Sequence, residues 1–266
     1  MPKVIAVIPV YNEEKTLWDI LSRVSPQVDL LICVNDGSVD RTRIILREFS
    51  KCENKTFVLN LPSNVGMAGA IKNGFLFVLY LLKMKIVKDD DIVVTIDADG
   101  QHKPEYIRKI IPYLIRKKVD VVLTRRDFSV YPKYKKIGNY FLTWTNSILS
   151  GIRYKDVESG MRFLRVKTIR PILSYYTGIK YSCAQEIALI SAKMGFKIDN
   201  DFLVEIAYYR PGTTFADGFI VLFLSFFTFA RCVLGIRSCV SIDSKLIRRS
   251  FLESRKTWFR KNKGSS

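Results

Sequence analysis

The sequence of 266 residues is poor in the residue types on which several common kinds of site depend. His102 is its single histidine, and its five cysteines lack the CxxC or Cys/His spacing of a zinc site. Because these cysteines are scattered and odd in number, they predict free thiols in a reducing compartment. A long hydrophobic run is missing too: the uncharged, mainly apolar segment 218–230 has thirteen residues, fewer than the roughly 18 to 20 that span a bilayer.

Acidic residues are also scarce. The chain has 25 Asp and Glu against 43 Lys and Arg, a net charge of +18, which implies an anionic partner such as phosphate, nucleic acid or acidic lipid. Nucleic acid is the least favoured, because the sequence shows no RNP-like aromatic strand, zinc finger or other basic recognition module. Residues 1–12 lack the charged n-region and long apolar h-region of a signal peptide, so we expect a cytoplasmic protein.

Short apolar, β-branched runs alternate along the chain with longer segments of helical period. This alternation predicts an α/β fold in which helices cover a mostly parallel sheet. The predicted strands lie at 4–10, 30–35, 56–59, 92–96 and 119–123, with a last one at 203–209. The predicted helices lie at 13–24, 41–49, 67–85 and 104–117, and then near 140–149, 168–175 and 184–194.

The composition changes near residue 217. We expect residues 1–217 to form one domain, residues 218–263 to form apolar and basic amphipathic helices, and residues 264–266 to be a disordered end. In the basic part, apolar residues recur at near-helical spacing between lysines and arginines: Ile242, Leu246, Ile247, Phe251, Trp258 and Phe259. Such a helix suits an anionic membrane surface. The alternative for segment 218–230 is a buried core helix.

The segment DADGQH, residues 97–102, directly follows the predicted strand 92–96. Residues i and i+2 of an extended segment point the same way, so Asp97 and Asp99 can converge on one cation, with a carbonyl oxygen of Gln101 next in line. Oxygen ligands of this kind favour Mg²⁺ or Mn²⁺. The alternative is that the two acids cap the next helix. We expect His102 to lie beside this site or at the start of that helix, because a single histidine has no partner ligand.

Polar residues also follow two other predicted strands. Tyr11 and Glu13 come after the first strand, and Asp36 comes after the second. Asp36 can accept a hydrogen bond from a nucleobase or a ribose hydroxyl, and Tyr11 offers a stacking face. Each segment alone is ordinary turn chemistry. Ligands of α/β proteins bind at the carboxyl ends of the strands, so polar residues at three such ends predict one binding site.

Six segments, in this order, carry a resemblance to a known family: IPVYNEE, VNDGSVDRT, NVGMAGAIKNGF, DADGQH, DVESGMRF and YYRPGTT. Over residues 2–214 the chain resembles the inverting GT-A glycosyltransferases of the dolichyl-phosphate mannose synthase type, including related polyprenyl-phosphate sugar transferases. The resemblance implies a Rossmann-like GT-A fold with helices on both faces of the sheet, and makes residues 1–217 the catalytic domain. It also implies metal-dependent, inverting transfer of a hexose from a nucleotide sugar to a dolichyl or polyprenyl phosphate.

The family's functional positions carry over onto residues of this chain. By resemblance, the nucleoside positions are Pro9, Tyr11, Glu13 and Asp36, the basic loop supplies Asn64 and Lys72, and the metal and diphosphate positions are Asp97, Asp99 and Gln101. The implied catalytic set is Asp99 together with Arg125, Lys135 and Arg210, the last three holding the acceptor phosphate. Two positions depart from the family. Asn35 replaces the first acid of its usual Asp-Asp pair, and Lys135 stands where a second arginine is common, so the bidentate contact of an arginine is lost there.

The resemblance also implies partners and a location. It predicts a peripheral or monotopic enzyme at the cytoplasmic face of a membrane, with a nucleotide sugar, a lipid phosphate and an anionic lipid surface as partners. It favours mannose from GDP-mannose, and next glucose from UDP-glucose. The rival interpretation keeps the GT-A fold but takes a saccharide or glycolipid hydroxyl as acceptor. A hydroxyl needs a general base, for which Asp156 or Glu158 is the candidate, whereas a phosphate is already ionised.

Overall fold

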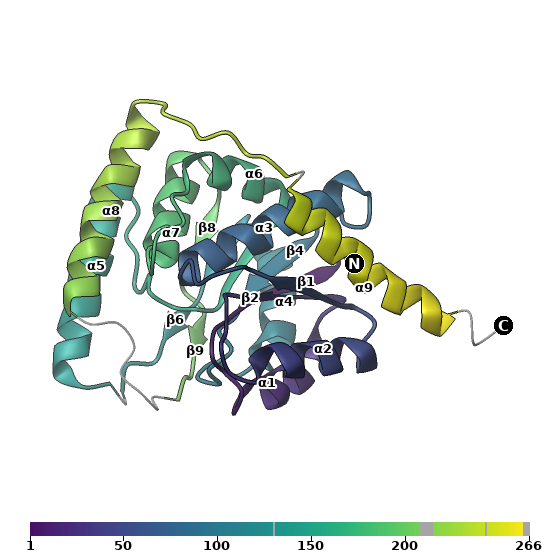
Figure 1. Cartoon of the computed structure of the whole chain (residues 1–266). Helices are drawn as coiled ribbons and strands as arrows, with labels where there is room; N and C mark the ends of the chain where they lie inside the picture. Colours follow the sequence, from purple (N-terminus) through teal and green to yellow (C-terminus); the bar gives the residue numbers. More distant parts are fainter. Residues whose placement is uncertain (130, 208–214, 243, 263–266) are drawn as a thin grey trace.

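The computed structural model describes residues 1–129, 131–207, 215–242 and 244–262, and for 215–216 and 256–262 it describes the backbone alone. Within these residues, a seven-stranded sheet has the strand order β3-β2-β1-β4-β7-β5-β8 (Figure 1). The strands are β1 (Val4–Val10), β2 (Leu30–Asn35), β3 (Thr56–Asn60), β4 (Ile92–Thr95), β5 (Val121–Leu123), β7 (Arg162–Arg165) and β8 (Ile198–Asp199). β7 runs antiparallel to its neighbours β4 and β5, and the other pairs are parallel. A small separate sheet pairs β6 (Arg125–Arg126) with β9 (Leu203–Val204).

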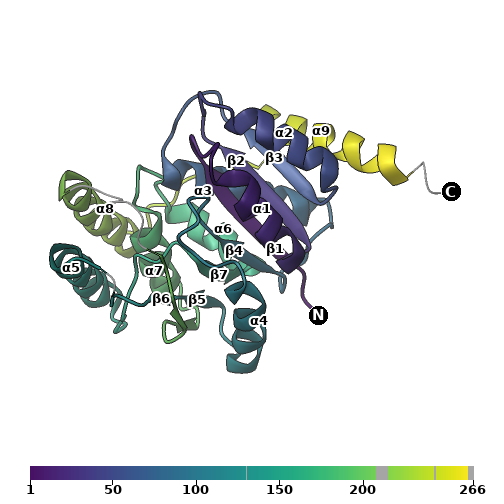
Figure 2. The same cartoon turned by 90° about the horizontal axis from the view of Figure 1, so that it is seen from below.

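Helices cover both faces of the large sheet (Figure 2). One face carries α1 (Leu17–Val24), α2 (Thr42–Cys52) and α4 (Tyr106–Lys117), and the other carries α3 (Met67–Lys83), α6 (Val166–Tyr175) and α7 (Cys183–Lys193). Side chains alternate between the two faces along each strand. In β1, Ile5 and Val7 therefore join the core on the α3 side, whereas Ala6 and Ile8 join the core on the α1 side. This arrangement confirms the predicted mostly parallel sheet between two layers of helices.

The sequence patterns predict most of these elements but miss three short strands: β6 and β8, which have two residues each, and β7. The predictions at 4–10 and 30–35 coincide with β1 and β2, and those at 41–49, 67–85 and 104–117 overlap α2, α3 and α4. The patterns do not predict β7, because its four residues, RFLR, begin and end with arginine. The strand predicted at 203–209 forms only β9 at its start, and residues 208–209 lie outside the described residues.

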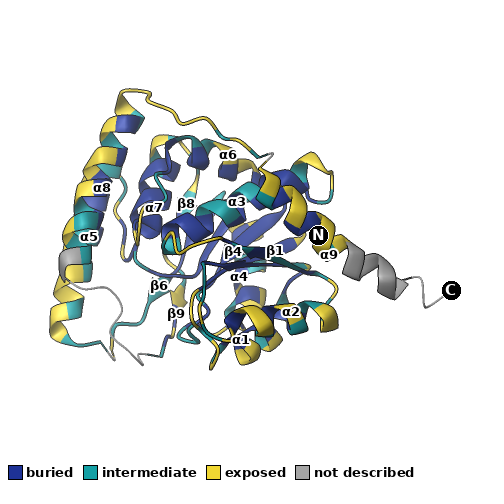
Figure 3. Cartoon of the chain, in the orientation of Figure 1, coloured by how far each residue is buried: buried dark blue, intermediate teal, exposed yellow. Residues whose placement is uncertain are grey.

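Two long helices form a layer beyond α7. The helices α5 (Lys133–Ser150) and α8 (Phe215–Val233) lie side by side and pack against α7 (Figures 1 and 2). Their other sides leave large apolar side chains exposed (Figure 3), and we call these the α5–α8 face: Ile137, Tyr140, Phe141, Trp144 and Ile148 with Phe219, Phe223, Phe226, Phe227 and Val233. The boundary predicted at residue 217 falls inside α8. None of the helices in the described part of the chain combines the length and the apolar composition that crossing a membrane requires.

The C-terminal helix α9 (Lys245–Asn262) packs along the β3 edge of the sheet (Figure 2). Phe251 of α9 is 3% exposed and stacks on Phe57 of β3 with 6.2 Å between the ring centroids. Ile247 is fully buried in the same core cluster. The prediction that this apolar series faces a lipid surface is therefore wrong for Ile247 and Phe251, because β3 and α3 offer them an apolar surface within the domain. The structure describes no side chain of Trp258 or Phe259.

Candidate active site

Three parallel strands bring predicted site residues to one edge of the sheet. The strands β1, β2 and β4 run in the same direction and in register, so their carboxyl ends deliver Tyr11, Asp36 and Asp97 to the same side of the molecule. Pro9 is buried inside β1, whereas Tyr11 is 45% exposed and free to offer a ring face. Glu13 lies half-buried between β1 and α1.

Asp97 and Asp99 form a pair of neighbouring carboxylates after β4. Burial, and then the charge of Asp99, raise the pKa of Asp97 to about 6. The positive charges of Arg162 and Arg126 oppose this rise, and the negative charge of Glu13 adds to it. The turn thus holds more negative charge than the surrounding cations balance.

The turn that carries this pair is closely packed. Asp99 Oδ1 accepts the backbone N–H of Gln101 at 3.0 Å, so the DADGQH segment folds back on itself. Gly160, from the segment after α5, lies against Asp97: a Cβ at this position would overlap Asp97 Oδ2 and lie 3.0 Å from Nε2 of His102. Glycine is required here because the Asp97 carboxylate occupies the space that a side chain would need.

The two carboxylates fit a divalent cation. Like charges in a half-buried turn repel each other unless a cation balances them, and this repulsion contributes to the raised pKa of Asp97. Mg²⁺ is commonly held by one or two carboxylates together with substrate phosphates and waters. Among the described residues, no cluster of three or more His, Cys, Asp or Glu side chains is placed to hold a metal ion. Gln101, the third predicted ligand, follows Asp99 by two residues in the same turn.

The loop before α3 contains the next group of predicted residues. Asp36 is buried, and its two carboxylate oxygens accept the backbone N–H groups of Val65 and Gly66 at 2.8 and 2.9 Å. Burial raises the pKa of Asp36, and these two hydrogen bonds oppose the rise. Asn64 also accepts from the Gly66 N–H, at 3.0 Å. Asp36 therefore shapes this loop as well as standing at the predicted nucleoside position.

The predicted cations lie on separate elements. Lys72 of α3 donates its ammonium to the carbonyl oxygen of Thr177 at 3.3 Å. Arg125 of β6 is half-buried, and its Nε has no hydrogen-bond partner within the described part of the chain. Lys135 lies in the first turn of α5, directly after the segment that follows β6. Arg210 lies outside the described residues.

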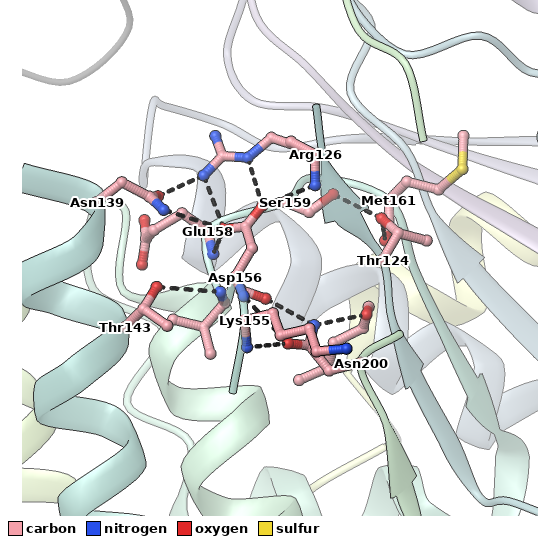
Figure 4. A network of polar contacts seen from close by, with 12 residues as sticks. Thr124, Arg126, Asn139, Thr143, Lys155, Asp156, Glu158, Ser159, Met161 and Asn200 are labelled. Atoms are coloured by element: carbon pink, nitrogen blue, oxygen red, sulfur yellow. Dashed lines mark hydrogen bonds and ion pairs between the residues drawn. The ribbon is translucent and has the colours of Figure 1, made fainter. Parts of the chain in front are cut away.

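Arg126, rather than Arg125, is the cation that the structure holds in place, and its side chain is 13% exposed. Nε and Nη2 of Arg126 donate to the two oxygens of Asp156 at 2.8 and 2.9 Å, and its backbone N–H donates at 3.0 Å (Figure 4). Asn139 of α5 and the Glu158 N–H donate to the same carboxylate. Burial alone would raise the pKa of Asp156, but the charge of Arg126 holds it below its ordinary value. Asp156 is thus a weak base with engaged oxygens, and sequence patterns alone did not single out its partner.

Three further groups belong to the DVESGMRF segment or to the DADGQH turn. Burial raises the pKa of Glu158, whose carboxylate accepts from Gln185 at 2.6 Å. Burial, and then the charges of Arg126 and Arg162, lower the pKa of His102 to about 3, so its imidazole is neutral near pH 7, with one ring nitrogen protonated and the other free of a proton. Arg162 is 2% exposed, and its Nε and Nη1 have no hydrogen-bond partner in the described part of the chain. In the sequence, Arg162 could have been found as a site residue from its position two residues after Gly160 in the DVESGMRF segment.

The seven-stranded sheet with helices on both faces is a GT-A fold, the fold of nucleotide-sugar transferases. Glucosyl-3-phosphoglycerate synthase from Mycobacterium tuberculosis, solved with Mn²⁺ and UDP-glucose, matches with a TM-score of 0.60 over 87% of this chain and 79% of that chain, at 17% identity. At this identity the likeness shows the fold alone. It confirms the GT-A architecture that the sequence motifs predict.

The family follows from the sequence. Residues 5–172 match Glycosyl transferase family 2, and the chain belongs to this family. It is 29% identical over 205 residues to a UDP-N-acetylglucosamine–dolichyl-phosphate N-acetylglucosaminyltransferase of Methanococcus voltae, covering 70% of this chain and 79% of that protein. It is 26% identical over 209 residues to an undecaprenyl-phosphate mannosyltransferase of Micrococcus luteus, covering 74% and 80%. The matched region includes both carboxylates of the DADGQH turn, and the resemblance drawn from the motifs is confirmed.

Proposed function

We propose that the protein transfers a hexose from a nucleotide sugar to a polyprenyl phosphate, such as dolichyl phosphate, at a membrane surface. The observation that carries this proposal is the Asp97–Asp99 pair, which lies at the carboxyl edge of the sheet of a family 2 glycosyltransferase. Both relatives described above are named for transfer to a lipid phosphate, but one is named for N-acetylglucosamine and the other for mannose. The class of acceptor is therefore better supported than the sugar, for which mannose remains our first choice.

The donor would bind over the ends of β1, β2 and β4. In this pose the exposed ring of Tyr11 stacks on the nucleobase, while Glu13 and Asp36 face the nucleoside. Mg²⁺ or Mn²⁺ held by Asp97, Asp99 and Gln101 would supply Lewis-acid stabilisation of the leaving diphosphate. Pro9 shapes the floor of the nucleoside site, and Asn64 and Lys72 lie along the loop that borders it.

The acceptor phosphate requires placement rather than deprotonation. It is ionised at neutral pH, so one of its oxygens can bond to the anomeric carbon while the bond to the nucleoside diphosphate breaks. The protein has to hold this oxygen in line with the breaking bond. We assign this task to Arg125, Lys135 and Arg210. Arg126, fixed by Asp156, adds a preorganised positive charge near the reacting groups.

The α5–α8 face supports action at a membrane surface. Large exposed apolar patches mark interaction surfaces, and aromatic side chains next to lysines suit the interface of an anionic bilayer. The first turn of α5 supplies exposed Lys133 and Lys136 beside this face. Because α5 follows β6 closely in the chain, a bilayer on this face would present its lipid phosphate near Arg125. We place this surface on the cytoplasmic side of the membrane.

The proposal is tested by a panel of nucleotide sugars with a short polyprenyl phosphate and Mg²⁺ or Mn²⁺. GDP-mannose, UDP-glucose and UDP-N-acetylglucosamine are compared as donors. We expect one of them to yield lipid-linked sugar, EDTA to stop the reaction, and Asp99→Ala to lower the rate about a hundredfold or more. Asp90→Ala, which alters an exposed carboxylate before β4, is the control and should behave as wild type. Transfer to lipid phosphate by none of the three donors would overturn the proposal.

The rival acceptor, a hydroxyl group, is tested at Glu158. Asp156 is held by Arg126 at a lowered pKa, so Glu158 is the remaining candidate base. With a hydroxyl acceptor, Glu158→Gln should cost about a hundredfold to ten-thousandfold in rate. With a phosphate acceptor, the same variant should keep its rate within about tenfold, since no base is required. Transfer to an oligosaccharide or glycolipid combined with the large loss in Glu158→Gln would favour the rival.

A further inference from the structure

Glu186 of α7 is a fully buried carboxylate outside the site described above. Its oxygens accept from the hydroxyls of Thr177 and Thr228, both at 2.7 Å, and at 3.2 Å from that of Ser182, which it shares with the Ile179 carbonyl at 2.8 Å. They also accept the backbone N–H of Thr177, at 3.2 to 3.3 Å, and that of Gly178, at 3.4 Å. These donors are all neutral. Burial raises the pKa of Glu186, and the hydrogen bonds oppose the rise.

The donors to Glu186 come from two different parts of the chain. Thr177, Gly178 and Ser182 belong to the loop 176–182, which joins α6 to α7. Thr228 belongs to α8, on the side opposite the exposed α5–α8 face, and is itself fully buried. One carboxylate therefore fastens both the loop and α8 to the domain.

The loop 176–182 is also the neighbour of the first turns of α3. The Ala68 N–H donates to the Lys180 carbonyl at 2.8 Å, and the Tyr176 hydroxyl donates to the Ala68 carbonyl at 3.2 Å. The ammonium of Lys72 donates to the Thr177 carbonyl at 3.3 Å. The loop that Glu186 fastens thus contacts the segment assigned above to the nucleotide.

A single peptide unit connects Glu186 to Lys72. The carbonyl of Thr177 and the N–H of Gly178 belong to the same peptide group, and in a trans peptide they point in opposite directions. The N–H of this peptide faces Glu186 and its carbonyl faces Lys72. The hydrogen bond from the N–H to Glu186 therefore orients the carbonyl toward the ammonium of Lys72. Gly178 has φ +74°, and a Cβ there would lie 2.9 Å from Cδ of Lys72, so this approach requires glycine.

We propose that Glu186 is a positioning residue of the donor site, which orients Lys72 through the Thr177–Gly178 peptide and links that peptide to α8 through Thr228. This inference rests on the proposed function, because it takes Lys72 as a nucleotide contact. Burying a carboxylate costs stability, and here its hydrogen bonds offset part of that cost while they hold several donors in one arrangement. Nucleotide affinity then depends on Thr228, a residue of the helix that carries the exposed aromatic side chains.

The test measures binding of UDP and of GDP, each with Mn²⁺, to the full-length protein by calorimetry. For the nucleotide that binds, Glu186→Gln should weaken affinity about tenfold and Thr228→Val about threefold, since each removes hydrogen bonds to a charged group. Thr228→Ser, which keeps the hydroxyl, should stay near wild type. Ser225→Ala is the matched control, because the Ser225 hydroxyl is buried in the same helix but donates to the Val221 carbonyl within α8 itself.

Two further readouts separate positioning from general destabilisation. Amide exchange at Thr177 and Gly178 should accelerate in Glu186→Gln, because the amide replaces one of the two acceptor oxygens by an NH2 group and removes the negative charge. In a Lys72→Met background, Glu186→Gln should cause no further loss of affinity, since it acts through Lys72. In turnover, the donor KM should rise while the KM for polyprenyl phosphate stays constant.

The outcomes distinguish this inference from the proposed function. If the wild type binds neither UDP nor GDP, the proposed donor site is wrong. The inference is then tested by amide exchange alone: exchange of residues 65–72 should be faster in Thr228→Val than in the wild type. If Glu186→Gln does not fold, Thr228→Val carries the test, because it removes one donor and keeps the carboxylate. Wild-type affinity and wild-type exchange in Thr228→Val, or additive losses in the Lys72→Met background, would overturn the inference.

Discussion

The consecutive helices α8 and α9 differ in where their apolar side chains lie: those of α9 pack into the core, whereas many of those of α8 are exposed. In α9, the apolar side chains recur among basic residues in the manner of a surface helix, yet Ile247 and Phe251 are buried against the sheet. α8 is far more apolar, yet Phe219 and Phe223 on it are 73% and 68% exposed, while Thr228 is buried toward α7. An amphipathic stripe shows that a helix has a partner without showing which one. A helix with more apolar side chains than one contact can bury indicates a second partner.

The largest expected effect is on stability. Phe251→Ala should lower the free energy of unfolding by about 3 to 5 kcal/mol, because it empties a place in the core next to Phe57. Phe223→Ala should change it by about 0.5 kcal/mol or less, since this side chain is exposed in the absence of lipid. Urea denaturation without lipid measures both. Equal losses in the two variants would show that α8 is buried by another part of the protein in solution.

The next effect is on membrane attachment. Phe223→Asp on α8 should weaken binding to anionic vesicles about ten- to a hundredfold, which corresponds to losing the roughly 1.5 to 3 kcal/mol gained by burying one large apolar side chain. Leu252→Asp alters an exposed apolar residue of α9 and is the matched control, expected to bind as wild type. Vesicle sedimentation gives both values. Truncation after Asp217 is a poorer test, because it also removes Phe251 from the core.

The contrast between these helices reflects what local patterns can predict. β1 and β2 follow from the sequence because buried parallel strands read as continuous apolar runs bounded by polar turns. The surroundings of α9 depend on β3, the edge strand that α9 covers, and β3 lies far away from α9 in the sequence. β7 is missed for a related reason: Arg162 and Arg165 belong to a strand only because β4 and β5 flank it on both sides.

Parts of the candidate site are likewise local and parts are not. Asp97, Asp99 and Gln101 are predictable because they share one short turn after a strand. Arg126 and Asp156 are 30 residues apart, and only the structure shows that their ion pair takes Asp156 out of consideration as a base. Glu186 gives no signal in the sequence, because its donors come from a loop and from α8, and no spacing rule connects them.

The smallest expected effect concerns charge beside the α5–α8 face. Lys133 is exposed in the first turn of α5, close in the chain to the residues assigned to the acceptor phosphate. A lysine near anionic headgroups contributes about 1 kcal/mol, so Lys133→Gln should weaken binding to anionic vesicles about fivefold at low salt. Lys245→Gln, at the exposed start of α9, should have no effect.

Raising the salt concentration to about 1 M shortens the screening length to about 3 Å, so the deficit of Lys133→Gln should disappear while that of Phe223→Asp persists. If Lys245→Gln weakened vesicle binding as much as Lys133→Gln, the start of α9 would face the lipid together with the α5–α8 face. The contrast between α8 and α9 would then hold for their apolar residues but not for the charged residues near them.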